Sequence, residues 1–251
     1  MRIARFLHEG RMLEGVLGPD DVLVAEGGTL KVPLGDVQLL PPCEPTKLVC
    51  VGRNYVEHAA ELGNEVPEEP LIFLKPPSAV IPSGAEIRYP AWSKLLHFEG
   101  ELAVVIGRRC RNVSAFQARD VIRGYTVMND VTARDRQKED KTWTRGKAFD
   151  ASAPLGPWLE TELDPDATRV RTWVNGELRQ DGETSLMVFR VPHLVATISR
   201  IMTLEPGDVI ATGTPAGVGE IRLGDTVEIE VDGVGRLTNA VAAADEAQLI
   251  E

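Results

Sequence analysis

The chain has 251 residues, of which 43% are hydrophobic and 26% charged, and its formal net charge is −11. These values are ordinary for a globular protein and exclude a disordered or fibrous chain. They also argue against a nucleic-acid-binding protein, because such a protein needs a block of lysine and arginine to displace counterions from phosphate.

The first ten residues are interrupted by charges and lack the apolar core of a secretory signal. No stretch of the sequence approaches the roughly 18 apolar residues of a membrane span. The three cysteines, Cys43, Cys50 and Cys110, form no C-x-x-C pair, so neither a disulfide scaffold nor a structural zinc site is expected. We therefore expect a cytoplasmic enzyme or binding protein with no membrane partner.

Residues 1–40 alternate short apolar runs with glycine-rich turns, which predicts a small set of antiparallel strands. The proline-rich segment 41–45 follows, and we place a domain boundary there. The expected division is a small N-terminal β-rich domain over residues 1–45 and a larger domain over residues 46–251.

Strand-like runs dominate the larger domain, and helical patterns are few. The expected strands are 47–52, 71–74, 101–106, 125–128, 172–174, 209–211 and 226–231, and the expected helices are 55–62, 115–122 and 193–202. Because helices and strands do not alternate regularly, a doubly wound parallel sheet is not expected. The predicted fold class is α+β and mainly β: a mixed, curled β-sheet or β-roll with peripheral helices.

The short helix predicted over residues 55–62 carries His58 and Glu61 three residues apart, on one helical face. An imidazole with a carboxylate beside it can act as a general base with an orienting partner. An ordinary surface pair of histidine and glutamate is the alternative.

The segment 97–106 places Glu99 and Glu101 at the head of an apolar strand. Strand side chains alternate between faces, so both glutamates share a face with His97 and with apolar positions further along. Burying two like charges together is costly, and a hard cation such as Mg²⁺, Mn²⁺ or Ca²⁺ would resolve the conflict. The alternative is a Glu-x-Glu pair on a solvated strand edge.

A third carboxylate, Asp130, follows the apolar strand near residues 125–128. Functional side chains are often found where strands end, and Asp130 would complete a three-carboxylate site that leaves room for water and substrate. Alternatively, Asp130 is the N-cap of a helix over residues 131–137. One residue could also serve both purposes.

Polar residues downstream are candidates for substrate contacts. Arg134 and Gln137 are three residues apart and would share a helical face that can hold a carboxylate or carbonyl group. Lys147 lies between Gly146 and Ala148, which leaves room for a substrate to approach. For each of these residues alone, a surface salt bridge is the alternative.

The glycine-rich loop 211–219 follows a strand but matches neither a P-loop nor G-x-G-x-x-G, so a nucleotide site is rejected. Its backbone N–H groups and the Thr214 hydroxyl could bind a carboxylate. A structural turn is the alternative.

Together these segments, in this order, resemble the fumarylacetoacetate hydrolase family. The resemblance runs from about residue 47 to the C-terminus and is carried by segments 52–58, 73–76, 97–101, 129–135, 147–149, 174–179 and 212–215. It is nearest to the branch of acylpyruvate hydrolases, oxaloacetate decarboxylases and 2-hydroxyhepta-2,4-diene-1,7-dioate isomerases. It implies a β-roll catalytic domain, a homodimer, and Mg²⁺ or Mn²⁺ on Glu99, Glu101 and Asp130. It further implies a lid-borne dyad of His58 and Glu61, a catalytic Lys147, and substrate contacts from Arg134, Gln137 and Thr214.

The resulting hypothesis is an enzyme that converts small 2-oxo acids or 2-hydroxy-dienoic acids through a metal-stabilised enolate. The same core would support C–C bond hydrolysis, decarboxylation or isomerisation. The alternative is a metal-dependent binding protein for small carboxylates, on the same fold and without turnover. A cupin-like metal barrel is disfavoured, because the four histidines are scattered along the chain.

Overall fold

The structure, a computed structural model that describes residues 1–244, contains three β-sheets. The largest sheet has 12 strands in the order β4-β3-β2-β1-β14-β12-β11-β17-β6-β7, with β5 paired to β1 and β8 to β14. Its strands are β1 (Arg2–His8), β2 (Arg11–Leu17), β3 (Val22–Ala25), β4 (Leu30–Pro33), β5 (Gln38–Leu40), β6 (Leu48–Gly52), β7 (Leu71–Lys75), β8 (Val80–Ile81), β11 (Gly100–Ile106), β12 (Ile122–Asn129), β14 (Ala153–Glu160) and β17 (Val209–Ala211).

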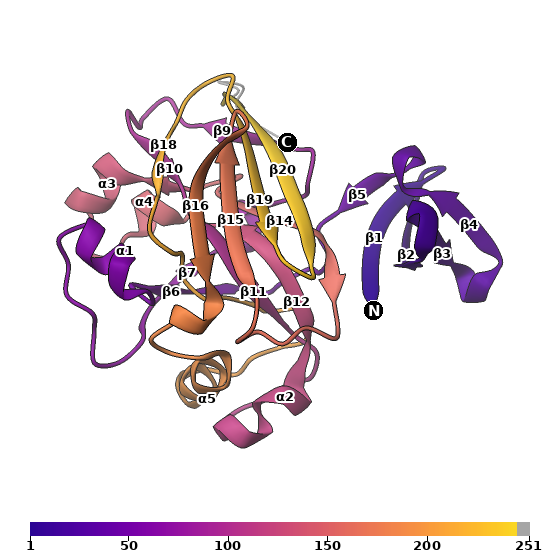
Figure 1. The fold of residues 1–251 in the computed structure, drawn as a ribbon, viewed down its shortest axis with the longest axis horizontal. Coiled ribbons are helices and arrows are strands. Elements are labelled where there is room, and N and C mark those ends of the chain that lie inside the picture. The colour runs from indigo at the N-terminus through magenta and orange to yellow at the C-terminus, as the bar shows by residue number, and fades with distance from the viewer. Residues whose placement is uncertain (245–251) are drawn as a thin grey trace, which may run out of the picture.

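Two smaller sheets complete the β structure. A five-stranded sheet has the order β16-β15-β19-β20-β9, and a three-stranded sheet has the order β13-β10-β18. Their strands are β9 (Glu86–Tyr89), β15 (Arg169–Val174), β16 (Glu177–Glu183), β19 (Thr226–Val231), β20 (Gly235–Ala243), β10 (Leu96–Phe98), β13 (Thr132–Ala133) and β18 (Gly219–Ile221). In Figure 1 the five-stranded sheet lies across the centre of the larger sheet.

The described part of the chain has five short α-helices, which lie around the sheets, with α1, α3 and α4 on one side and α2 and α5 at one end (Figure 1). They are α1 (Val56–Glu61), α2 (Ala118–Val121), α3 (Arg134–Glu139), α4 (Thr144–Lys147) and α5 (Val191–Ile201). Short 3-10 turns occupy Pro19–Asp21, Glu26–Gly28, Leu34–Asp36, Pro77–Ala79, Ala115–Gln117 and Thr184–Leu186. Among residues 1–244, no helix is long and apolar enough to cross a bilayer. The predicted fold, mainly β with mixed sheets and peripheral helices, is confirmed.

The core is divided between the two faces of β11, a strand that is buried along its whole length. Leu102, Val104 and Ile106 belong to the cluster that fills the space against the five-stranded sheet and α5, whereas Ala103 and Val105 belong to a second cluster on the other face. Burial of both faces explains why the strand reads as a continuous apolar run.

Strands β1 to β5 lie apart from the main body in Figure 1 and have a small core of their own, centred on Phe6 and Leu23. The connection to the main body includes a strand pair: β1 is antiparallel to β14, with Arg2 opposite Glu160. The division at residue 45 stays a prediction.

Two helix predictions need correction. The helix expected over residues 115–122 is a 3-10 turn followed by the four-residue α2. The helix expected over residues 131–137 begins only at Arg134, after β13, and its N-cap is Ala133. The N-cap interpretation of Asp130 is therefore wrong, and its carboxylate faces lysine side chains instead.

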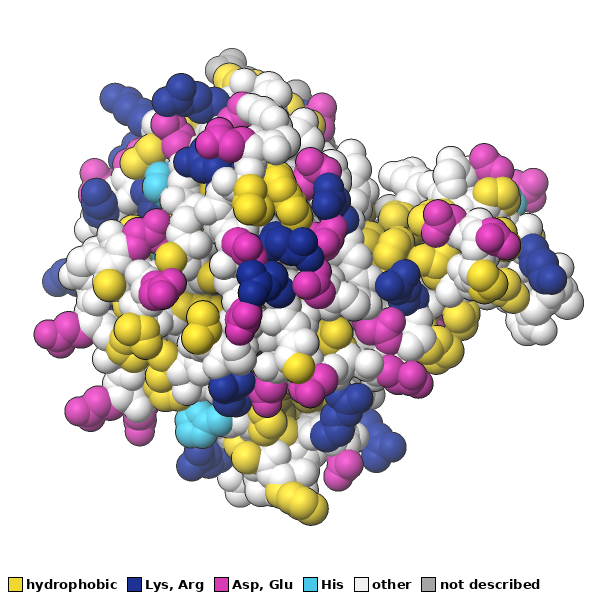
Figure 2. Space-filling view, in the orientation of Figure 1, with side chains coloured by type: hydrophobic (Ala, Val, Ile, Leu, Met, Phe, Trp, Pro, Cys, Tyr) yellow, Lys and Arg dark blue, Asp and Glu magenta, His cyan; other side chains and the backbone are white. Residues whose placement is uncertain are grey.

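The outer face of the five-stranded sheet is exposed and carries interspersed positive and negative side chains (Figure 2). These charges pair across strands: Arg169 with Asp181, Arg171 with Glu230, and Arg236 with Glu228. Cross-strand pairs of opposite charge stabilise a sheet modestly. This face of the sheet is therefore interpreted as an ordinary solvent-exposed surface.

Candidate active site

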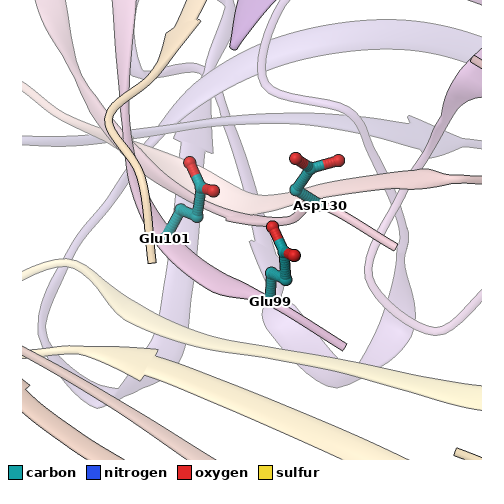
Figure 3. Close-up of side chains that lie close together, drawn as sticks. All are labelled: Glu99, Glu101 and Asp130. Atoms are coloured by element: carbon teal, nitrogen blue, oxygen red, sulfur yellow. The ribbon is translucent and has the colours of Figure 1, made fainter. Parts of the chain in front are cut away.

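The pairing of the central strands brings the three predicted carboxylates together. Gly100 on β11 lies opposite Asn129 on β12, so Glu99 and Glu101 flank the end of β12, where Asp130 follows. One carboxylate oxygen from each residue lies within 4.8 Å of the other two, and Figure 3 shows the three groups pointing toward one another. Their exposed fractions are 5%, 1% and 1%. The alternative of a solvated strand edge is therefore wrong.

The strand predicted to run through residues 97–106 is interrupted at Glu99, where β10 ends and β11 begins. Only glycine fits at position 100 of this junction, because a Cβ there would lie 2.3 Å from the Thr172 hydroxyl oxygen and would clash with it. Glu99 and Glu101 are thus held on either side of a position that packs against the five-stranded sheet.

Three buried cations surround the carboxylates. The Lys147 ammonium donates to Glu99 Oε2 at 2.8 Å and to Asp130 Oδ2 at 2.6 Å. Arg134 donates to the other oxygen of Glu99. Lys75 Nζ lies 2.8 Å from Asp130 Oδ1. All three cations contact Glu99 or Asp130, and none of them forms an ion pair with Glu101.

The two glutamates differ in electrostatic environment. Burial would raise the pKa of Glu99, but Lys147 and Arg134 outweigh this and hold that pKa well below its usual range. Burial raises the pKa of Glu101 well above its usual range, and the neighbouring carboxylates of Asp130 and Glu99 raise it further. Glu101 is thus the carboxylate whose charge is least compensated.

The cluster fits a divalent cation. Among the described residues, Glu101 has no cationic partner and accepts only the Gly213 N–H, at 2.8 Å. Asp130 Oδ1, though close to Lys75, accepts no hydrogen bond from the described chain. Buried carboxylate oxygens of this kind are ligands that Mg²⁺ and Mn²⁺ prefer.

His58 and Glu61 lie together on α1, as predicted. Their Nδ1 and Oε2 atoms are 3.3 Å apart, and Glu61 also accepts the Gly217 N–H at 3.2 Å. His58 is 6% exposed, and burial lowers its pKa below the ordinary 6.5. The imidazole is therefore neutral at pH 7, and a proton on Nδ1 would leave Nε2 free as an acceptor.

One pocket of about 350 Å³ is lined by His58, Glu99, Glu101, Arg134, Gln137, Lys147 and Thr214. Arg134 and Gln137 share a face of α3, and Arg134 Nη1 donates to the Gln137 amide oxygen at 2.8 Å. The Gln137 amide nitrogen has no partner among the described residues. This nitrogen is available to a ligand.

The glycine-rich loop after β17 contributes Thr214 to the lining of the pocket. The Thr214 hydroxyl donates to the Gly100 carbonyl at 2.8 Å and accepts from Gln180, so its hydrogen is already in use. The backbone N–H of Thr214, in contrast, donates to no residue of the described chain. A ligand contact from Thr214 would use this N–H.

Sequence reasoning assigned no role to Lys75, the lysine at the end of the apolar strand β7. Its side chain is fully buried and donates to the carbonyls of Val131 and Ser152, at 3.1 and 2.8 Å. The sequence feature that could have indicated a role is a lysine at the end of an otherwise apolar strand, since a lysine that is buried requires partners. Arg53 and Trp143, which also line the pocket, carried no such signal.

Comparison with known proteins places this site in a family. Residues 47–242 match the family model described as "Fumarylacetoacetate (FAA) hydrolase C-terminal". The chain belongs to the fumarylacetoacetate hydrolase family. Residues 1–42 match a second model, described as "Rv2993c-like, N-terminal".

Relatives in this family include enzymes of several reaction types. The chain is 46% identical to human mitochondrial oxaloacetate tautomerase FAHD1 over 197 residues, which cover 76% of this chain and 89% of the relative. A structure of 5-carboxymethyl-2-hydroxymuconate delta-isomerase from Mycobacterium smegmatis is 46% identical, with a TM-score of 0.92 and coverage of 98% and 100%. A structure of fumarylpyruvate hydrolase from Pseudomonas aeruginosa in complex with Mn²⁺ and pyruvate is 36% identical, with a TM-score of 0.75 and coverage of 82% and 92%.

Proposed function

We propose that this protein is a divalent-metal-dependent enzyme that converts small 2-oxo acids or 2-hydroxy-dienoic acids through an enolate. The observation that carries the proposal is the buried, uncompensated carboxylate of Glu101 beside Glu99 and Asp130, in a pocket that also holds a neutral histidine. The Mn²⁺ and pyruvate named for the fumarylpyruvate hydrolase structure support it.

In this proposal Glu99, Glu101 and Asp130 hold Mg²⁺ or Mn²⁺. A cation there would supply positive charge to the keto and carboxylate oxygens of a 2-oxo acid as enolate charge develops. Lys147 adds a fixed positive charge next to the same oxygens and stays protonated, because Asp130 and Glu99 outweigh the burial that lowers its pKa.

His58 moves the proton. Its Nδ1 side is occupied by Glu61, so Nε2 is the basic atom, either toward a substrate carbon or toward a water that attacks a distal carbonyl. Arg134, the Gln137 amide nitrogen and the Thr214 N–H orient the substrate by donating to its oxygens.

The reaction that follows enolate formation distinguishes three activities, namely hydrolysis, decarboxylation and isomerisation. Purified protein with Mg²⁺ or Mn²⁺ should be assayed with acetylpyruvate, with oxaloacetate for both tautomerisation and decarboxylation, and with a 2-hydroxy-diene dioate. Turnover of at least one is expected. Binding of all three without turnover would instead support the metal-dependent binding protein.

We also propose a homodimer, as the family resemblance implies. Light scattering should then give twice the chain mass of 27.4 kDa. A monomer at working concentration would contradict this part of the proposal without affecting the site.

A further inference from the structure

Two positive side chains in the pocket have no partner among residues 1–244. Arg53 and Lys138 both line it, yet neither forms a hydrogen bond or ion pair with any described residue. The ion pairs of Glu99 and Asp130 are made by Lys75, Lys147 and Arg134. Arg53 and Lys138 take no part in these ion pairs.

The backbone holds Arg53 in an unusual conformation. Its φ is 59°, in the left-handed region, which is unfavourable for a residue with a Cβ. The next residue, Asn54, is fully buried and anchors the turn, with its amide nitrogen 2.7 Å from the Thr212 carbonyl and its amide oxygen 2.7 Å from the Phe189 N–H. The position of Arg53 at the pocket is thus fixed from within the protein.

Lys138 extends the positive charge away from the carboxylates. It lies four residues after Arg134 on α3 and so shares its face, about 6 Å further along the helix axis. Arg134 contacts Glu99, whereas Lys138 is exposed. The helix therefore leads from the carboxylate cluster to a free cation at the pocket mouth.

The wall of the pocket is aromatic. Phe73 and Trp143 both line it and contact each other edge to face, with ring centroids 5.6 Å apart. Trp143 also packs against Gly52, where a Cβ would lie 3.2 Å from the indole ring. Such a wall suits a short carbon chain that joins two polar ends.

We propose that Arg53 and Lys138 form an outer anion subsite that binds the second carboxylate of a 2-oxo dicarboxylic acid. The inference rests on the proposed function, which places the 2-oxo acid end of the substrate at the carboxylate cluster. A guanidinium offers paired donors that match a carboxylate, and a flexible ammonium adds a second charge. The preferred substrate class is therefore 2-oxo acids with a terminal carboxylate, and not monocarboxylic acylpyruvates.

The test compares oxaloacetate with its C4 methyl ester, which has the same 2-oxo acid end but lacks the second charge. The Mg²⁺-loaded wild type and the variants Arg53→Asn, Arg53→Lys and Lys138→Gln are compared by kcat/KM and by calorimetric binding of each compound. Asparagine tolerates the left-handed conformation, so Arg53→Asn removes the charge with little backbone strain. Lys141→Gln is the matched control, because Lys141 is exposed and does not line the pocket.

The wild type should prefer the diacid, and Arg53→Asn and Lys138→Gln should each weaken diacid binding about tenfold, equivalent to about 1.4 kcal/mol. Binding of the ester should not change, Arg53→Lys should restore most of the affinity, and Lys141→Gln should behave as wild type. Added salt should weaken diacid binding more than ester binding, since Arg53 and Lys138 are reached by solvent.

Equal affinity of the wild type for diacid and ester would overturn the subsite and leave the proposed function standing. Equal losses for both compounds in the variants would also overturn it, because they would indicate general damage to the pocket. Failure of the wild type to bind or convert either compound would overturn the proposed function itself, and the subsite with it.

Discussion

Replacement of Lys75 by methionine should reduce stability sharply, because the side chain is fully buried among oxygen atoms. The ammonium lies 2.8 Å from Asp130 Oδ1 and donates to the carbonyls of Val131 and Ser152 and to the Ser152 hydroxyl at 3.0 Å. Methionine fills a similar volume but removes the positive charge beside Asp130 Oδ1 and the N–H groups that these acceptors receive. Breaking a buried ion pair in this way costs roughly 3–5 kcal/mol.

For a chain of this length, each kcal/mol changes Tm by roughly 2–4 °C, so the expected decrease is roughly 6–20 °C by calorimetry. Amide exchange should also increase near Lys147 and Ser152, whose carbonyls Lys75 holds. Arg11→Met is the control, because Arg11 and Glu26 form an exposed pair worth at most about 1 kcal/mol. If the two variants lost the same small amount of stability, the argument that Lys75 compensates Asp130 would be refuted.

Three further predictions concern the cation, the base and the cysteines. Mg²⁺ or Mn²⁺ at about 100 times its Kd should stabilise the wild type by about 2.7 kcal/mol, measured as an increase in Tm. Glu101→Gln should abolish this increase while leaving the metal-free protein at least as stable as the wild type. A full increase in Tm in that variant would exclude Glu101 as a ligand. His58→Gln should lower kcat by about 10²–10⁴-fold with metal binding retained. Because burial lowers the pKa of His58 below 6.5, wild-type turnover should hold down to pH 6.5 and decline only at lower pH. The stability contributed by neutral His58 should likewise be present above pH 6.5 and lost as pH falls through its folded pKa. A decline in turnover that begins above pH 7 would contradict this assignment. Finally, burial raises the pKa of Cys43 to about 12 and that of Cys50 well above its usual range. A thiol reagent should therefore label these two cysteines only after unfolding. Rapid labelling of the native protein would contradict their burial.

The sequence predicted the parts of the site that depend on local spacing. Glu99 and Glu101 were recognisable from strand alternation, and Arg134 and Gln137 from their three-residue separation on a helix. Asp130 required a further inference, that polar residues at a strand end mark a site. These residues lie where short-range geometry governs side-chain direction.

The remaining features depend on contacts between distant segments. Arg53, with its positive φ, precedes Asn54, whose side chain forms hydrogen bonds with Phe189 and Thr212, far away in the sequence. The helix start at Arg134 could not be located either, because β13 pairs with β10 and displaces the first helical turn. Neither interaction has a local pattern from which to infer it.

Helix α1 is six residues long, and Glu61 on it accepts an N–H from the loop after β17, whereas Glu101 belongs to the buried strand β11 and Asp130 directly follows β12. The two residues proposed to transfer the proton and the three carboxylates proposed to hold the cation therefore lie on separate elements. In this proposal, substitutions in α1 would change where a proton is delivered without altering the carboxylate cluster. Such an arrangement allows one scaffold to diversify its chemistry by altering a small surface element.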